Sequence, residues 1–113
     1  MSLPEAARTT DAGAFRLVPG PSGGLAAQGP LNFASARRAS ELGVRALAEA
    51  TGARLEIDCA GVTVSDSAGL AVLLEWLGVA KRAGRALRYT QLPAGLAALA
   101  RISDVQELLE RGV

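Results

Sequence analysis

A short run of hydroxyl and carboxylate side chains is the part of this sequence that could carry chemistry. The run Gly61–Leu70 reads Gly-Val-Thr-Val-Ser-Asp-Ser-Ala-Gly-Leu. We expect a loop over residues 61–66 and then the first turn of a helix, where unpaired N–H groups and a partial positive charge favour anions. Asp66 or Ser65 would cap that helix, and a phosphoryl group on Ser67 would add a charge of about −2. The run therefore predicts either a plain helix cap or a phosphorylatable switch.

The two small residues after Ser67 belong to the same candidate site. Ala68 and Gly69 fall in the first turn of the expected helix. Because Gly69 has no side chain, we expect it to leave room for a partner or a phosphate to approach the backbone.

Composition argues against most catalytic chemistry. The 113 residues contain no His, one Cys and a single Lys, and no Gly-x-x-x-x-Gly-Lys phosphate loop is present. Asp58 and Asp66 lack a third ligand type, so they do not predict a metal site. Twelve basic residues face eleven acidic ones, which is too balanced for a nucleic-acid binder. We expect no enzyme activity, no cofactor and no metal.

Hydrophobic periodicity predicts alternating strands and helices. Arg54–Ala60 alternates cleanly and points Cys59 inward as a small buried residue. Leu70, Leu73, Leu74 and Leu77 have the i, i+3, i+4, i+7 spacing of a helix. The expected strands are 14–18, 25–28, 54–60 and 86–92, and the expected helices are 33–50, 67–83, 93–101 and one beginning at a capping box over 103–106.

This order predicts an α/β fold. Strands separated by helices imply parallel pairing, and the Gly/Pro turn after residue 18 implies an antiparallel hairpin at the N-terminal edge. We expect a mixed sheet of about four strands, with helices packed mainly on one face. Residues 1–12 read as a flexible tail and 13–113 as a single domain.

The unit from Leu55 to Leu77 resembles the STAS domain, a family that includes anti-sigma factor antagonists and the cytoplasmic domains of sulfate transporters. Asp66-Ser67-Ala68-Gly69-Leu70 is similar to the family's phosphorylatable loop, with Ser67 at the phosphoacceptor position. The resemblance covers about residues 14–111. It implies a STAS-like fold and a function in protein–protein interaction.

Two further stretches resemble the MlaB-like branch of the family. They are Gly29-Pro30-Leu31-Asn32-Phe33-Ala34 and the run Leu73-Leu74-Glu75-Trp76-Leu77 with Lys81-Arg82-Ala83-Gly84 after it. This resemblance implies a non-catalytic accessory subunit of a phospholipid-transporting ABC complex, which maintains outer-membrane lipid asymmetry. Its partner would be the ATPase subunit and, through it, a permease and an MCE lipid-binding protein. It would be cytoplasmic and peripheral to the inner membrane, without a membrane span of its own.

Other functions remain open at this point. The main alternative is an anti-sigma factor antagonist controlled by phosphorylation of Ser67, although Asn32 stands where that group usually has Asp. An enzyme or a nucleotide-binding protein is a third, weaker reading. The isolated chain could also form a homodimer.

A second apolar face on the 67–83 helix suggests a partner interface. Val72, Trp76 and Val79 share a side that is off the leucine stripe. Trp is enriched at interface hot spots, whereas the alternative is packing beneath a neighbouring helix. The resemblance favours the interface.

Overall fold

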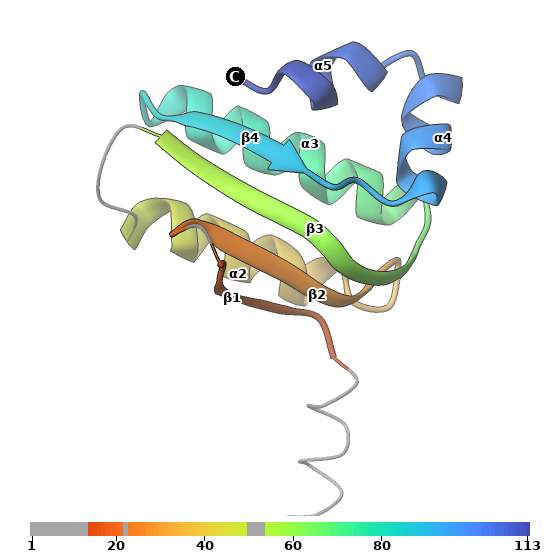
Figure 1. The fold of residues 1–113 in the computed structure, drawn as a ribbon, viewed down its shortest axis with the longest axis horizontal. Coiled ribbons are helices and arrows are strands. Elements are labelled where there is room, and N and C mark those ends of the chain that lie inside the picture. The colour runs from red at the N-terminus through yellow and green to blue at the C-terminus, as the bar shows by residue number, and fades with distance from the viewer. Residues whose placement is uncertain (1–13, 22, 50–53) are drawn as a thin grey trace, which may run out of the picture.

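The structure is a computed structural model that describes residues 14–21, 23–49 and 54–113. The tail expected over residues 1–12 and the helix stop expected at Thr51-Gly52 lie outside these ranges. Figure 1 shows the elements, which are β1 (Arg16–Pro19), β2 (Leu25–Leu31), α2 (Ala36–Glu49), β3 (Arg54–Ser65), α3 (Ser67–Arg82), β4 (Ala86–Thr90), α4 (Ala94–Ile102) and α5 (Gln106–Arg111).

One four-stranded sheet, in the order β1-β2-β3-β4, organises the described residues. β1 and β2 pair antiparallel, while β2–β3 and β3–β4 pair parallel. Parallel neighbours need a long crossover, and α2 and α3 provide it. These two helices lie along one face of the sheet, and α4 and α5 lie beyond β4 (Figure 1). The predicted fold class is confirmed.

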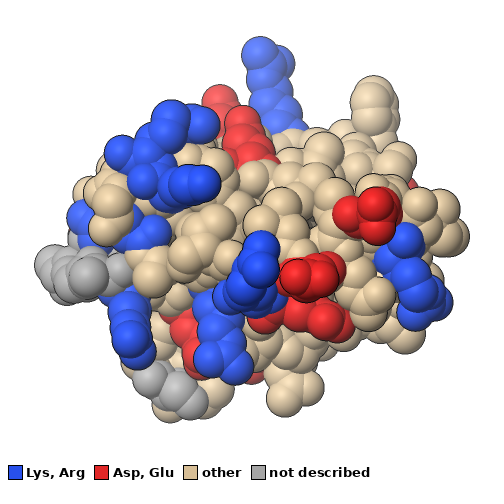
Figure 2. All heavy atoms as spheres, turned by 90° about the horizontal axis from the view of Figure 1, so that it is seen from above, with Lys and Arg blue, Asp and Glu red and all other residues tan. Residues whose placement is uncertain are grey.

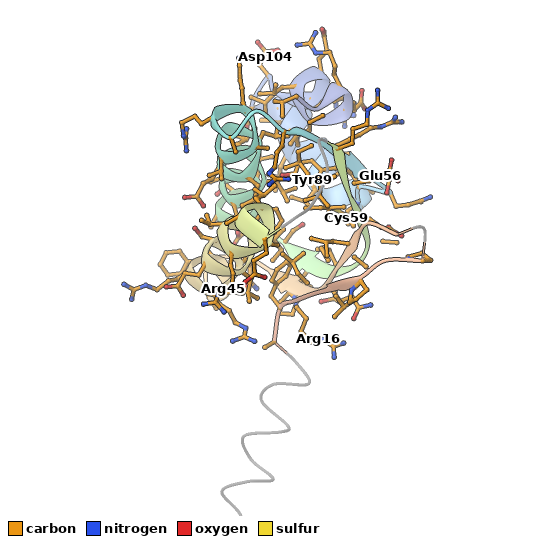
Figure 3. All side chains as sticks on the ribbon, turned by 90° about the vertical axis from the view of Figure 1, so that its left-hand side faces the viewer. Arg16, Arg45, Glu56, Cys59, Tyr89 and Asp104 are labelled. Carbon is orange, nitrogen blue, oxygen red and sulfur yellow. The ribbon has the colours of Figure 1, made fainter. Side chains whose placement is uncertain are left out.

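The core lies between the sheet and α2 and α3. In β3, Ile57 and Cys59 are 1% and 0% exposed, and the intervening residues face the other side. In Figure 3, Cys59 and Tyr89 point toward the helices and Glu56 points away from them. The Tyr89 hydroxyl donates to the carbonyl oxygen of Leu73 at 2.6 Å, and burial raises the pKa of this phenol well above its ordinary value.

Two of the strands are longer than expected. The predicted break at Gly29–Asn32 and the predicted loop at Gly61–Asp66 are wrong, because β2 continues to Leu31 and β3 to Ser65. Gly61 pairs with Gln28, and Ser65 pairs with Leu31. The register shifts between Gly29 and Leu31, which accommodates a proline that has no N–H to donate to the ladder.

The chain end differs from the expected capping box. Ser103 is the C-cap of α4, and α5 follows Val105 without a side-chain cap. Leu109 is 0% exposed, which confirms that this helix turns it inward. The backbone N–H of Val113 donates to the carbonyl oxygen of Leu87 at 3.0 Å. The last residues therefore lie along the outer edge of β4.

Charge is distributed unevenly over the surface. Figure 2 shows basic side chains gathered toward the end where β3 and β4 begin, on the left of that view. Open grooves at this end are lined by Arg54, Arg88 and Arg111, together with Glu49 and Glu56. The hydroxyl-rich run lies instead at the carboxyl end of β3 and in the first turn of α3. The two ends of the sheet therefore differ in chemistry.

Candidate partner-binding site

Asp66 forms the cap of α3. Its backbone is extended, and its Oδ1 accepts hydrogen bonds from the N–H groups of Ala68 at 2.9 Å and Gly69 at 3.1 Å. A third N–H, that of Leu70, donates to the backbone oxygen of Asp66 at 3.1 Å. Asp66 thus satisfies the first donors of the helix, as expected for a carboxylate at an N-cap. The expected alternative, Ser65, is the last residue of β3.

The second oxygen of the same carboxylate reaches a different part of the chain. Asp66 Oδ2 accepts a hydrogen bond at 3.0 Å from the backbone N–H of Phe33, in the turn before α2. The bond from Phe33 has the largest effect and lowers the pKa of Asp66. Desolvation, the next largest, raises it, and the bonds from Gly69 and Ala68 lower it further, so the pKa lies below its ordinary value. One side chain therefore ties the starts of α2 and α3 together.

The hydroxyl of Ser67 lies on the surface beside this cap. Ser67 is the first residue of α3 and is exposed, while Ser65 and Ala68 are half-buried. Ser65 faces the start of α4, where a methyl group added at Gly95 would lie 3.7 Å from its Oγ. The candidate site is therefore accessible at Ser67, in the first turn of α3.

Asp66 is not placed to activate the hydroxyl of Ser67. Asp66 is the carboxylate next to the Ser67 hydroxyl, but its oxygens already accept three backbone hydrogen bonds and its pKa is low. A general base works best with a pKa near the working pH, so Asp66 is a poor proton acceptor. Anions added at Ser67 would also meet this carboxylate rather than free N–H groups.

The expected role of Gly69 is wrong. Gly69 is buried, and a methyl group at this position would lie 2.0 Å from the carbonyl oxygen of Leu31. The glycine lets the first turn of α3 pack directly against the end of β2, so the space beside it is filled by the chain itself. It leaves no room for a partner or a phosphate.

The interface expected at Trp76 and Val72 is also wrong. Trp76 is 0% exposed and Val72 is 5% exposed. The indole packs against Gly43 of α2, where an added methyl group would lie 2.0 Å from the ring, and its centroid is 6.1 Å from that of Phe15. The second apolar face of α3 therefore packs beneath α2. Val79 is half-buried, and its expected place in a partner interface stays a prediction.

Phe33 is a surface residue that the sequence reasoning did not assign to the site. Its side chain is 83% exposed, the highest value among the exposed large hydrophobic residues of the described ranges. The sequence placed it at the start of a helix, whereas α2 begins at Ala36 and Phe33 lies in a turn. Its apolar type next to two polar turn residues was the available signal.

Comparison with known proteins places this fold in one class. The architecture is similar to a solved structure of the anti-sigma factor antagonist SpoIIAA in its unphosphorylated form, with a TM-score of 0.57 and 12% identity over 86% of this chain and 84% of that chain. A family model described as the Mlab STAS domain matches residues 19–110. The chain therefore belongs to this STAS-domain family. A search of curated proteins finds no match.

No helix in the described ranges is long and apolar enough to cross a membrane. STAS domains mediate protein–protein interaction, and this chain belongs to that family.

Proposed function

We propose that this protein is a non-catalytic accessory subunit of a phospholipid-transporting ABC complex and that it binds the ATPase subunit through the surface around Ser67. The observation that carries the proposal is the match of residues 19–110 to the Mlab STAS domain. The geometry is consistent with it, because Ser67 is exposed in the first turn of α3, which Asp66 caps. Association with the inner membrane would then be indirect, through the permease, and the MCE protein would be a more distant partner.

A second candidate is an anti-sigma factor antagonist controlled by phosphorylation. It is favoured by the accessible Ser67 hydroxyl, and the fold is similar to that of unphosphorylated SpoIIAA. That likeness is at 12% identity, so it supports the fold rather than the function. The two candidates share the docking loop and differ in the partner.

Native co-purification separates the two candidates. The full chain would be tagged in its own host, solubilised gently, and its partners identified by mass spectrometry. An ABC ATPase with its permease is the expected result, followed by direct binding of the purified ATPase in a calorimetric titration. A serine kinase in their place, with a phosphate mass shift at Ser67, would replace the transporter proposal by the antagonist.

A further inference from the structure

The turn before α2 projects one large aromatic side chain into solvent. Phe33 is 83% exposed, although burial of a Phe side chain is worth about 1.5–3 kcal/mol. Single exposed apolar residues are common on protein surfaces. Exposure alone therefore does not mark Phe33 as a binding residue. The further evidence is the set of hydrogen bonds that fix its backbone and the residues that lie beside it.

The backbone on both sides of Phe33 is fixed by hydrogen bonds. The N–H of Phe33 donates to Asp66 Oδ2 at 3.0 Å. The N–H of Asn32 donates to Ser35 Oγ at 3.0 Å, and that hydroxyl donates to the carbonyl oxygen of Pro30 at 2.8 Å. The N–H of Ser35 in turn donates to Asn32 Oδ1 at 3.2 Å. A side chain presented from such a turn loses little conformational entropy of the backbone on binding.

The same carboxylate places Phe33 next to the candidate docking loop. Asp66 binds Phe33 through Oδ2 and the first turn of α3 through Oδ1. The exposed Ser67 follows Asp66 directly. The backbone of Phe33 and the exposed Ser67 therefore adjoin the same carboxylate. We call the exposed residues Phe33, Arg37, Ser67 and Ala71, at the starts of these two helices, the α2–α3 surface.

The charge of this surface indicates the chemistry of its partner. Of the four exposed residues of this surface, only Arg37 carries a charge, and it lies in the first turn of α2. The Asp66 carboxylate between the two helix starts is half-buried, and its oxygens are engaged by the N–H groups of Phe33, Ala68 and Gly69. An apolar pocket bordered by carboxylates is the complementary surface. By contrast, Ile102, which is 80% exposed, lies at the end of α4 next to Arg101, where no such loop is present.

We propose that Phe33 is the anchor of the α2–α3 surface and that it inserts into an apolar pocket flanked by acidic side chains on a protein partner. The inference rests on the proposed function for the identity of that partner, the ATPase subunit. Aromatic residues at the centre of an interface are the type that dominates binding energy. In this proposal Asp66 is a positioning residue, because its carboxylate fixes the backbone of Phe33.

A pair of matched truncations tests the proposal. The purified full chain would be titrated into the purified ATPase subunit as wild type, Phe33→Ala and Ile102→Ala. Phe33→Ala is expected to weaken binding at least about tenfold, a typical hot-spot effect, with an unchanged unfolding midpoint. Ile102→Ala removes an equally exposed apolar side chain and is expected to change the affinity less than about twofold. Equal effects of the two variants would overturn the proposal.

The charge of the pocket is tested by Arg37→Glu. This variant is expected to weaken binding, with the loss reduced at high salt because exposed charges are screened. Arg101→Glu, a charge reversal beside Ile102, is the control and is expected to leave the affinity unchanged. An unaltered affinity of Arg37→Glu would contradict an acidic border to the pocket.

The failure of this inference and the failure of the proposed function give different results. If the wild type binds the ATPase and Phe33→Ala binds equally well, the anchor is wrong and the function stands. If tagged wild type retains a serine kinase instead and Phe33→Ala loses it while Ile102→Ala keeps it, the function is wrong and the anchor stands. Capture of no partner, or self-association of the wild type that Phe33→Ala abolishes, overturns the anchor proposal.

Discussion

The carboxylate of Asp66 accepts a hydrogen bond at 3.0 Å from the backbone N–H of Phe33, a residue 33 positions earlier in the chain. Through its other oxygen the same group caps α3. The start of α2 and the start of α3 therefore share one acidic side chain. A charge change at the neighbouring Ser67 acts next to the group that holds Phe33 in place.

Addition of negative charge at Ser67 is expected to weaken partner binding. Ser67→Asp puts a second carboxylate beside Asp66, where like charges repel and the N–H groups of Ala68 and Gly69 are already engaged. Titration of the ATPase subunit with this variant measures the effect. Ser103→Asp, at an exposed hydroxyl on the C-cap of α4, is the control, and an affinity of Ser67→Asp equal to the control would contradict the prediction.

The hydrogen bonds of Asp66 should make stability depend on acid pH. Bonds from Phe33, Gly69 and Ala68 lower the pKa of Asp66 below its ordinary value of 3.8. The folded protein holds this proton less tightly than the unfolded chain, so the stabilisation is complete above pH 3.8 and is lost as the pH falls through the folded-state pKa. Urea unfolding followed by circular dichroism, from pH 7 to pH 2, measures it.

Asp66→Asn provides the reference for that series. The amide cannot titrate, and its NH₂ group cannot accept the bond from Phe33. We expect the wild type to be more stable than Asp66→Asn at pH 7 and the difference to shrink below pH 3.8. A constant difference across the whole range would show that the carboxylate charge contributes nothing.

Gly69→Ala is expected to destabilise the fold. The added methyl group would lie 2.0 Å from the carbonyl oxygen of Leu31, which is backbone and cannot rotate away, so a loss of about 1–3 kcal/mol follows from overpacking. Chemical denaturation gives the value. At Gly95 of α4 the nearest atom is 3.7 Å away, and Gly95→Ala is expected to be neutral or to stabilise by about 0.5–1 kcal/mol. The prediction fails if the two variants behave alike.

Trp76→Ala is expected to lower the free energy of unfolding by about 3–5 kcal/mol, because it empties a fully buried site. Weaker partner binding by this variant would then follow from unfolding rather than from a lost contact. Measurement of binding at a temperature where the variant remains folded separates the two effects. If the folded Trp76→Ala variant lost more affinity for the partner than Phe33→Ala does, Trp76 would contribute directly to binding, and this prediction would be wrong.

Cys59 is expected to be unreactive in the folded protein. Burial, with a smaller contribution from the charge of Asp58, raises the pKa of this thiol from 9.0 to about 12. Alkylation should be slow in buffer and fast in urea. Because the folded-state pKa is raised, the corresponding stabilisation is complete below pH 9 and is lost as the pH rises toward 12. The difference in free energy of unfolding between wild type and Cys59→Ala over this range separates the effect of the thiol from that of Tyr89, which both proteins contain.

The sequence was sufficient for the element order and the pairing of the strands. Alternation in Arg54–Ala60 and the leucine spacing of residues 70–77 both depend on local geometry, which the structure retains. The strand ends were predicted poorly. Gly29 and Gly61 were taken as breaks, yet neighbouring strands hold both in the ladder. Local propensity does not record what lies beside a residue in space.

In the candidate site too, the feature that depends on local sequence was predicted, and the features that depend on distant contacts were not. The cap at Asp66 was predictable because N-capping is local. The roles of Gly69 and Trp76 were not, since each depends on contact with a distant segment, Leu31 or Gly43. The exposure of Phe33 depends on where α2 begins, and helix ends are the least certain part of any such prediction.

The indole of Trp76 has a practical consequence for experiments. It is the only Trp in the chain, it is 0% exposed, and its Nε1 has no hydrogen-bond partner among the described residues. Its fluorescence should therefore be emitted at short wavelength in the folded protein and shift to the red on unfolding. Docking at Phe33 and Ser67 should leave this emission unchanged. The chain thus contains an optical probe that reports folding and is insensitive to binding at the α2–α3 surface.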